Sequence, residues 1–384
     1  MTEVLQDFIA IGLVALVGGM ASLFLWLVRG GRGRLLPLQR LRPGAWQGRE
    51  VALVFLFMAF VPAIAQGFLE EIGFFQGFYG KEPAPVQKTL WTKTLASPII
   101  VAGTFLILYS LSRTRPSQLG MTTGRISRNI VLGWLAWFPL TVLTLILFAV
   151  VKLWIEAQKH PVEMLGKQSI LAEWLLGILV VVVFAAFEEE LIFRGVLQGW
   201  LQRCSPIGHL VLAGSTLFVS IADFLQQTKE KPVEFNLGAF IFALILIAGY
   251  LWVVRMAEGE RKKEEMGKQN SLIPSSGMRV RRASAYAAIF GSSMLFAVFH
   301  SQVWPTPIPL FFLGLGLGWL AYRTQSLVSS ITVHVLFNSV AFLVLGLNVI
   351  YGKPNGNAET DAFRPSPAGS KSTMVPGSWW PRFK

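Results

Sequence analysis

The sequence predicts an all-α fold, a polytopic membrane helical bundle with about ten transmembrane helices (eight to ten). Hydrophobic residues make up 53% of its 384 residues and charged residues only 14%, whereas soluble proteins carry about a quarter charged residues. The apolar residues form separate long runs, many of them long enough to cross a hydrocarbon layer of about 30 Å. Basic residues gather in the short loops beside these runs, as is typical of membrane proteins.

Ten apolar runs are candidate spans, several of them near the lower length limit for crossing a bilayer. In chain order they are Phe8–Val28, Val51–Leu69, Leu95–Ser112, Ile130–Trp154, Trp174–Phe193, Ile207–Leu225, Phe235–Val254, Ser284–His300, Pro307–Tyr322 and Leu327–Ile350. The first run follows Glu3 and Asp7 and has neither a basic n-region nor an obvious small-residue cleavage site. We therefore expect an anchor there rather than a removed signal peptide.

The distribution of Lys and Arg predicts the orientation. Of the 34 basic residues, 21 lie on the side reached after the odd-numbered runs, 8 lie on the other side and 5 in the C-terminal tail. The basic side faces the cytoplasm by the positive-inside rule, so both termini are expected outside, in a plasma or inner membrane. This topology also explains the net charge of +13, so no nucleic-acid partner is expected.

The chain divides into N-terminal transmembrane helices at 1–173, a core at 174–350 and a tail at 351–384. The tail is rich in Pro, Gly and Ser and is predicted to be disordered. The charged run Arg255–Arg282 is predicted to be a solvated cytoplasmic loop. The single cysteine, Cys204, excludes an intrachain disulfide and a Cys-based zinc site.

The segment FAAFEEELIFRGVLQ places charges at the end of an otherwise apolar helix. A charged side chain inside a spanning segment costs about 2.5–3.5 kcal/mol on insertion scales, so such residues usually serve a function. Glu190 and Arg194 are four residues apart and can pair, while Glu189 is rotated by about 100° and is free to handle a proton. A helix ending near Phe187 would instead leave an interfacial charge cluster. The apolar pattern continues to Leu197, which favours a functional site.

Two of the four histidines lie inside apolar runs, His300 in SSMLFAVFHS and His334 in SSITVHVLFNS. Either one alone is more often a helix–helix hydrogen-bond partner than a catalyst. His334 and Asn338, however, share one helix face at a four-residue spacing. With a nearby carboxylate, these groups could activate a water and stabilise an oxyanion, as amide hydrolysis requires.

The same residue types leave a metal site open as an alternative. Glu189, His300 and His334 could hold a divalent metal such as zinc with one open coordination position. At about 1.5 Å per residue, Glu189 and His334 fall at similar depths in their helices, whereas His300 falls nearer the outer side. Convergence of all three is therefore a prediction for the structure to test.

Three ordered motifs resemble those of the CPBP family, which includes the type II CAAX prenyl endopeptidases and bacteriocin-processing or immunity proteins. They are Glu189-Glu190-x-x-x-Arg194, Phe296-x-x-x-His300 and His334-x-x-x-Asn338. The flanking text EELIFRGVLQ, SSMLFAVFH and FLGLGLGWLAYRTQSLVSSITVHVLFN is also similar to the family core. The resemblance covers about Trp174 to Gly346 but not the middle, where we expect an insertion at about 205–283 that adds two spans.

The resemblance implies an intramembrane endopeptidase, described for the family either as a metalloprotease or as a glutamate-dependent protease. Glu189 would be the general base, assisted by Glu190 and with Arg194 orienting the carboxylates. His300, His334 and Asn338 would complete a site that opens toward the cytoplasm. The expected partners are the lipid bilayer and a membrane-protein or lipidated-peptide substrate, including the prenylated CAAX type.

Two other functions remain open at this point. A catalytically idle scaffold or immunity-type protein of the same fold would bind a membrane partner without cutting it. A proton-coupled transporter would use the Glu and His residues as a relay. The transporter predicts broken helices in two related halves, and the sequence shows no such symmetry.

Overall fold

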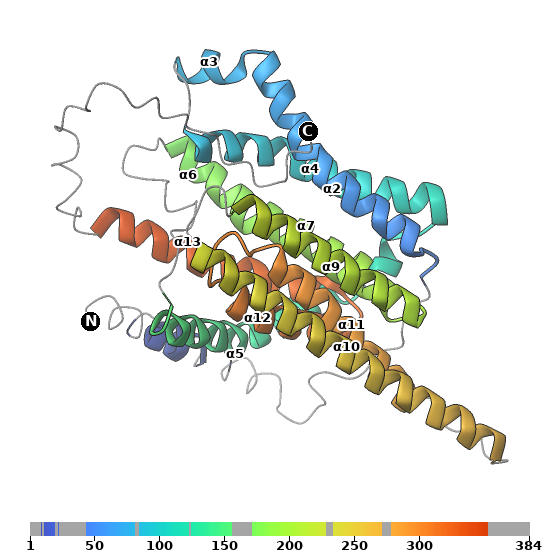
Figure 1. Ribbon diagram of the computed structural model, residues 1–384. Coiled ribbons are helices and arrows are strands. Elements are labelled where there is room, and N and C mark those ends of the chain that lie inside the picture. The colour runs from blue at the N-terminus through green and yellow to red at the C-terminus, as the bar shows by residue number, and fades with distance from the viewer. Residues whose placement is uncertain are drawn as a thin grey trace.

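The computed structural model shows an all-α bundle, which confirms the predicted fold class (Figure 1). It describes residues 9, 11–19, 22, 44–80, 84–122, 124–155, 171–227, 233–270 and 278–351. Parts of the first predicted span, residues 8, 10, 20, 21 and 23–28, and the C-terminal tail from residue 352 on lie outside the described residues. The longer helices are α2 (Gly48–Glu71), α4 (Pro85–Ser112), α5 (Ile126–Lys152), α9 (Pro206–Gln227), α10 (Val233–Asn270), α11 (Met278–Val298), α12 (Pro307–Thr324) and α13 (Leu327–Tyr351).

Six helices in this part of the chain are long and apolar enough to cross a membrane, fewer than the ten predicted spans. They comprise residues 48–71, 85–112, 126–152, 206–226, 237–263 and 327–344. The other predicted spans within the described residues are helical too. The apolar part of α11, Ala283–Val298, is shorter, and the predicted span Trp174–Phe193 lies in a helix interrupted by two wider turns.

That interrupted helix carries the first motif through the middle of the bundle. It comprises α6 (Leu171–Gly177), a π-helical stretch (Ile178–Phe184), α7 (Ala185–Glu189), a second π-helical stretch (Glu190–Leu197) and α8 (Gln198–Leu201). Every residue of Glu190–Leu197 is buried. The helix therefore continues past Phe187, and the interfacial cluster that would follow from a helix end there is not formed. Stretches of π-helix often occur at functional sites.

The other helices pack around this central element. The first π-helical stretch contacts α4 and α13, and the second contacts α2, α11, α12 and α13. The buried Gln198 amide donates a 2.9 Å hydrogen bond to the Gly318 carbonyl of α12, and Ser292 of α11 bonds to the Gln198 amide oxygen at 3.2 Å. The helices that carry the second and third motifs are thus docked on the helix that carries the first.

The charged run after the seventh predicted span is largely helical, so the prediction of a loop at Arg255–Arg282 was wrong for its first part. Helix α10 continues to Asn270, and its C-terminal end projects beyond the other helices (Figure 1). Lys, Glu, Met and Arg are good helix formers, and Glu260 and Lys263 form an i,i+3 ion pair at 3.7 Å. Residues 271–277 lie outside the described residues.

A glycine permits the close packing of α5 against α13, and its replacement should destabilise the fold. A Cβ on Gly133 would lie 2.5 Å from the Ser329 carbonyl oxygen and 2.7 Å from Thr332 Cβ. We expect Gly133→Ala to lower the free energy of unfolding by about 1–3 kcal/mol, because α13 must shift. Unfolding midpoints in detergent would measure this. Gly67→Ala, where a Cβ meets nothing within 4 Å, is the control, and equal losses in both variants would contradict the packing argument.

Candidate active site

The ion pair expected from the four-residue spacing is present and fully buried. Arg194 Nη1 lies 3.2 Å from Glu190 Oε1, and both side chains are 0% exposed. The Arg194 guanidinium also lies 4.5 Å above the centre of the Phe296 ring and 3.5 Å from the Gly314 carbonyl oxygen. Three helices therefore fix the arginine, and the arginine in turn fixes the Glu190 carboxylate.

His334 lies between the two glutamates of the first motif. Its Nδ1 is 3.1 Å from Glu190 Oε1, and its Nε2 is 3.7 Å from Glu189 Oε2. The first distance is a hydrogen bond, whereas the second is a looser contact. Glu190 is wholly buried, but the Glu189 side chain is 25% exposed. Of the two carboxylates, only Glu189 is accessible to a water molecule and free of the arginine.

The neighbouring Glu188 faces away from this site. Its buried side chain is directed at α4, where it interacts with Ser97 and Lys93. The three consecutive glutamates thus have three different surroundings, as their rotation about the helix axis requires.

His300 does not contact the carboxylates directly. It follows the end of α11, and its Nδ1 lies 2.8 Å from the carbonyl oxygen of Phe296. Because a carbonyl oxygen can only accept, Nδ1 donates this bond and carries a proton.

The ring of Phe296 connects the three motifs and was not among the predicted site residues. Its centre is 4.8 Å from the His300 ring and 6.0 Å from the His334 ring, and the Arg194 guanidinium lies over its face. Phe296 is itself 1% exposed. The signal was available in the sequence, because Phe296 opens the second motif one helical turn before His300.

Asn338 shares the face of α13 with His334, as its spacing predicts, but has a different partner. Its Nδ2 donates a 2.9 Å hydrogen bond to the carbonyl oxygen of Val181, in the first π-helical stretch of the central helix. A side-chain amide carries two N–H groups, and this bond uses one of them. The second N–H remains available for another acceptor.

The predicted metal ligands do not come together. Among the described residues, no group of three or more His, Cys, Asp and Glu side chains is arranged to hold a metal ion. The Phe296 ring contacts both His300 and His334. Zinc ligation by Glu189, His300 and His334 would require all three to lie within about 2.0–2.2 Å of one ion, an arrangement that the described side chains do not have.

The predicted insertion corresponds to α9, α10 and the start of α11. Helices α9 and α10 pack against each other, and both contact α11. Both contain stretches that are long and apolar enough to cross a membrane.

Comparison with known proteins identifies the family. The family described as type II CAAX prenyl endopeptidase Rce1-like matches residues 171–257 and 264–340. These ranges contain all six predicted catalytic residues, and they also contain α9 and most of α10, leaving out only 258–263 within the matched region. No curated protein and no solved structure matches the chain. The match over residues 171–340, which contain the three motifs in order on the central helix, at the end of α11 and on α13, supports a CPBP family protein, and that family includes the type II CAAX prenyl endopeptidases.

Proposed function

We propose that the chain is an intramembrane endopeptidase that hydrolyses peptide bonds of membrane-associated substrates, including lipidated peptides of the prenylated CAAX type. The main support for the proposal is that His334 contacts two glutamates in different surroundings. Glu189 is accessible, whereas Glu190 is buried and paired with Arg194. Membership of a protease family supports a peptidase, and the apolar helices support a bilayer as its surroundings.

In the proposed reaction Glu189 accepts a proton from a water molecule, and the resulting hydroxide attacks the scissile carbonyl carbon. His334 lies beside Glu189 and is held in place by Glu190. The proton on Glu189 then passes to the leaving nitrogen as the C–N bond breaks. The products are a new carboxylate and a free amine.

Two residues are proposed to stabilise the oxyanion that forms during attack. The second N–H of Asn338 is one donor, and the bond to Val181 fixes the plane of that amide. His300 is the other, acting through Nε2 when it is protonated. Hydrogen-bond donors placed where charge develops typically contribute about 10²–10³ in rate each. The excess of basic residues on one side supports an orientation in which this site opens toward the cytoplasm.

Cleavage in proteoliposomes tests the proposal. The purified chain should cut a farnesylated CAAX peptide and should cut its unprenylated counterpart more slowly, since the prenyl chain concentrates the substrate in the bilayer. Mass spectrometry of the products would identify the bond. Absence of cleavage across lipidated and transmembrane substrates would contradict the protease and favour the idle scaffold.

Removal of metal ions should leave this activity in place. Because the described His and carboxylate side chains form no three-ligand group, cleavage after treatment with a strong chelator is expected to stay within about twofold of the untreated rate. The same proteoliposome assay with and without chelator measures this. Loss of cleavage on chelation, with recovery on adding zinc, would show that the site binds a metal.

A further inference from the structure

Helix α9 contains an ionisable residue that the proposed reaction does not use. Asp223 is the only charged residue in the apolar span 206–226. A carboxylate inside such a segment is costly and usually has a specific partner. Asp223 is half-buried, and its partner lies beside the second motif.

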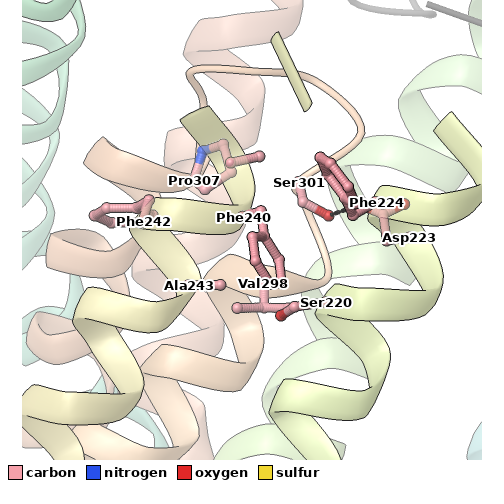
Figure 2. Close-up of a pocket in the computed structure, with 10 residues that line it drawn as sticks. Ser220, Asp223, Phe224, Phe240, Phe242, Ala243, Val298, Ser301 and Pro307 are labelled. Carbon is pink, nitrogen blue, oxygen red and sulfur yellow. Dashed lines mark hydrogen bonds between the residues drawn. The ribbon is translucent and has the colours of Figure 1, made fainter. Parts of the chain in front are cut away.

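That partner is Ser301, the residue after His300. The Ser301 hydroxyl donates to Asp223 Oδ2 at 2.7 Å, a bond that links positions 78 residues apart. Figure 2 shows this bond at the edge of a narrow pocket between α9, α10 and the turn after α11. The pocket has room for about one water molecule, and its lining includes Ser220, Asp223 and Ser301. An O–H···O⁻ bond of this length is charge-assisted and strong, and little water competes with it.

The turn that carries His300 also contains backbone hydrogen bonds of its own. The His300 N–H donates to Ala297 at 2.9 Å, the Ser301 N–H to Val298 at 3.1 Å, and the His300 carbonyl accepts from Val303 at 3.2 Å. The Phe299 ring also packs against Phe55 of α2 and Phe193 of the central helix, with ring centres 6.1 and 5.8 Å apart. The Asp223–Ser301 bond ties the residue next to His300 to a further membrane-spanning helix, α9.

We propose that Asp223 is a positioning residue for His300, acting through Ser301. The bond to α9 sets the direction in which the turn leaves α11, and with it the place of the His300 ring against Phe296 and the site at Glu189. On this account α9 is part of the catalytic apparatus, although it contributes no group to the reaction. The expected change in kcat rests on the proposed protease function, whereas the expected change in the position of the His300 ring does not.

The kinetic test compares variants of the full chain in proteoliposomes. Asp223→Leu and Ser301→Ala should each lower kcat about tenfold or more with KM changed less than about twofold, because misplacing a catalytic group can cost up to about 10²-fold. Asp223→Asn, which can still accept from Ser301, should recover kcat to within about threefold of the native chain. The double variant Asp223→Leu/Ser301→Ala should be no slower than the slower single variant.

A matched control lines the same pocket. The Ser220 hydroxyl donates to the Thr216 carbonyl of its own helix at 2.8 Å, so Ser220→Ala removes a buried hydroxyl without touching the turn. Its kcat should stay within about twofold of the native value. Losses in the two single variants that multiply in the double variant, or an equal loss in Ser220→Ala, would overturn the proposal. If Asp223→Leu does not fold, Ser301→Ala carries the same test with a smaller change.

A second readout does not depend on activity. The chain has only four histidines, so ¹⁵N-histidine NMR in detergent can resolve them, with His300→Gln used for assignment. The His300 ring signals should shift or broaden in Asp223→Leu and in Ser301→Ala, while those of His209, which bonds to Tyr250, stay in place. Unchanged His300 signals would overturn the positioning role. If the native chain cleaves nothing, the protease proposal fails, and these spectra still decide whether Asp223 positions His300.

Discussion

Replacing Glu189 with Gln should lower kcat for peptide cleavage by a factor of about 10²–10⁴, the usual contribution of a general base. Glutamine has nearly the same shape but cannot accept a proton from water. The Glu190–Arg194 pair and the Glu190–His334 hydrogen bond do not involve Glu189, so the variant should fold normally. Initial rates in proteoliposomes, with a thermal unfolding midpoint for each variant, would measure both effects.

The chain provides a matched control in the preceding residue. Glu188 is a glutamate in the same helix, but it is buried and interacts with Ser97 and Lys93 of α4. Glu188→Gln should therefore keep kcat within a fewfold of the native value. Equal losses in the two variants would show that both act on the stability of the helix, and full activity of Glu189→Gln would remove Glu189 from the role of base.

Replacing Arg194 with Met should destabilise the protein by about 3–5 kcal/mol, because it leaves the Glu190 carboxylate charged and unpaired in a fully buried place. The guanidinium contact with the Phe296 ring and the bond to the Gly314 carbonyl are lost as well. Denaturant titration in mixed micelles, followed by tryptophan fluorescence, would measure the change in the free energy of unfolding.

The double variant Glu190→Gln/Arg194→Met separates stability from catalysis. With both charges removed, most of the lost stability should return, since a buried ion pair contributes little relative to neutral groups of similar volume. Cleavage should remain low, because His334 loses its bond to a fixed carboxylate. A double variant as active as the native chain would mean that the pair does not orient His334.

Local spacing predicted part of this site well. The i,i+4 spacing of Glu190 and Arg194 led directly to their ion pair, because helix periodicity alone places the two side chains on one face. The same periodicity placed His334 and Asn338 together on α13, and length and hydropathy predicted the all-α membrane bundle. The placements of Glu190 with Arg194 and of His334 with Asn338 were predictable because each depends only on spacing within one helix.

The spacing of residues in the sequence did not predict the contacts between helices. The hydrogen bond from Asn338 to Val181 depends on the path of the π-helical stretch Ile178–Phe184. The helix propensities of these residues do not indicate a wider turn. The contacts of the Phe296 ring with His300 and His334 depend on the packing of α11 and α13 against the central helix. The predicted loop at Arg255–Arg282 failed because charged residues that are good helix formers extend α10 into solvent.

The central claim is that Glu189 makes this chain a peptidase rather than a scaffold. Its most direct test compares the membrane proteins that bind to the native chain and to the Glu189→Gln variant in the same membranes. After crosslinking and purification, mass spectrometry would record the length of each co-purified membrane protein. The account predicts a partner that is intact with Glu189→Gln and shortened at one defined bond with the native chain. The same intact partner recovered with both chains would contradict it.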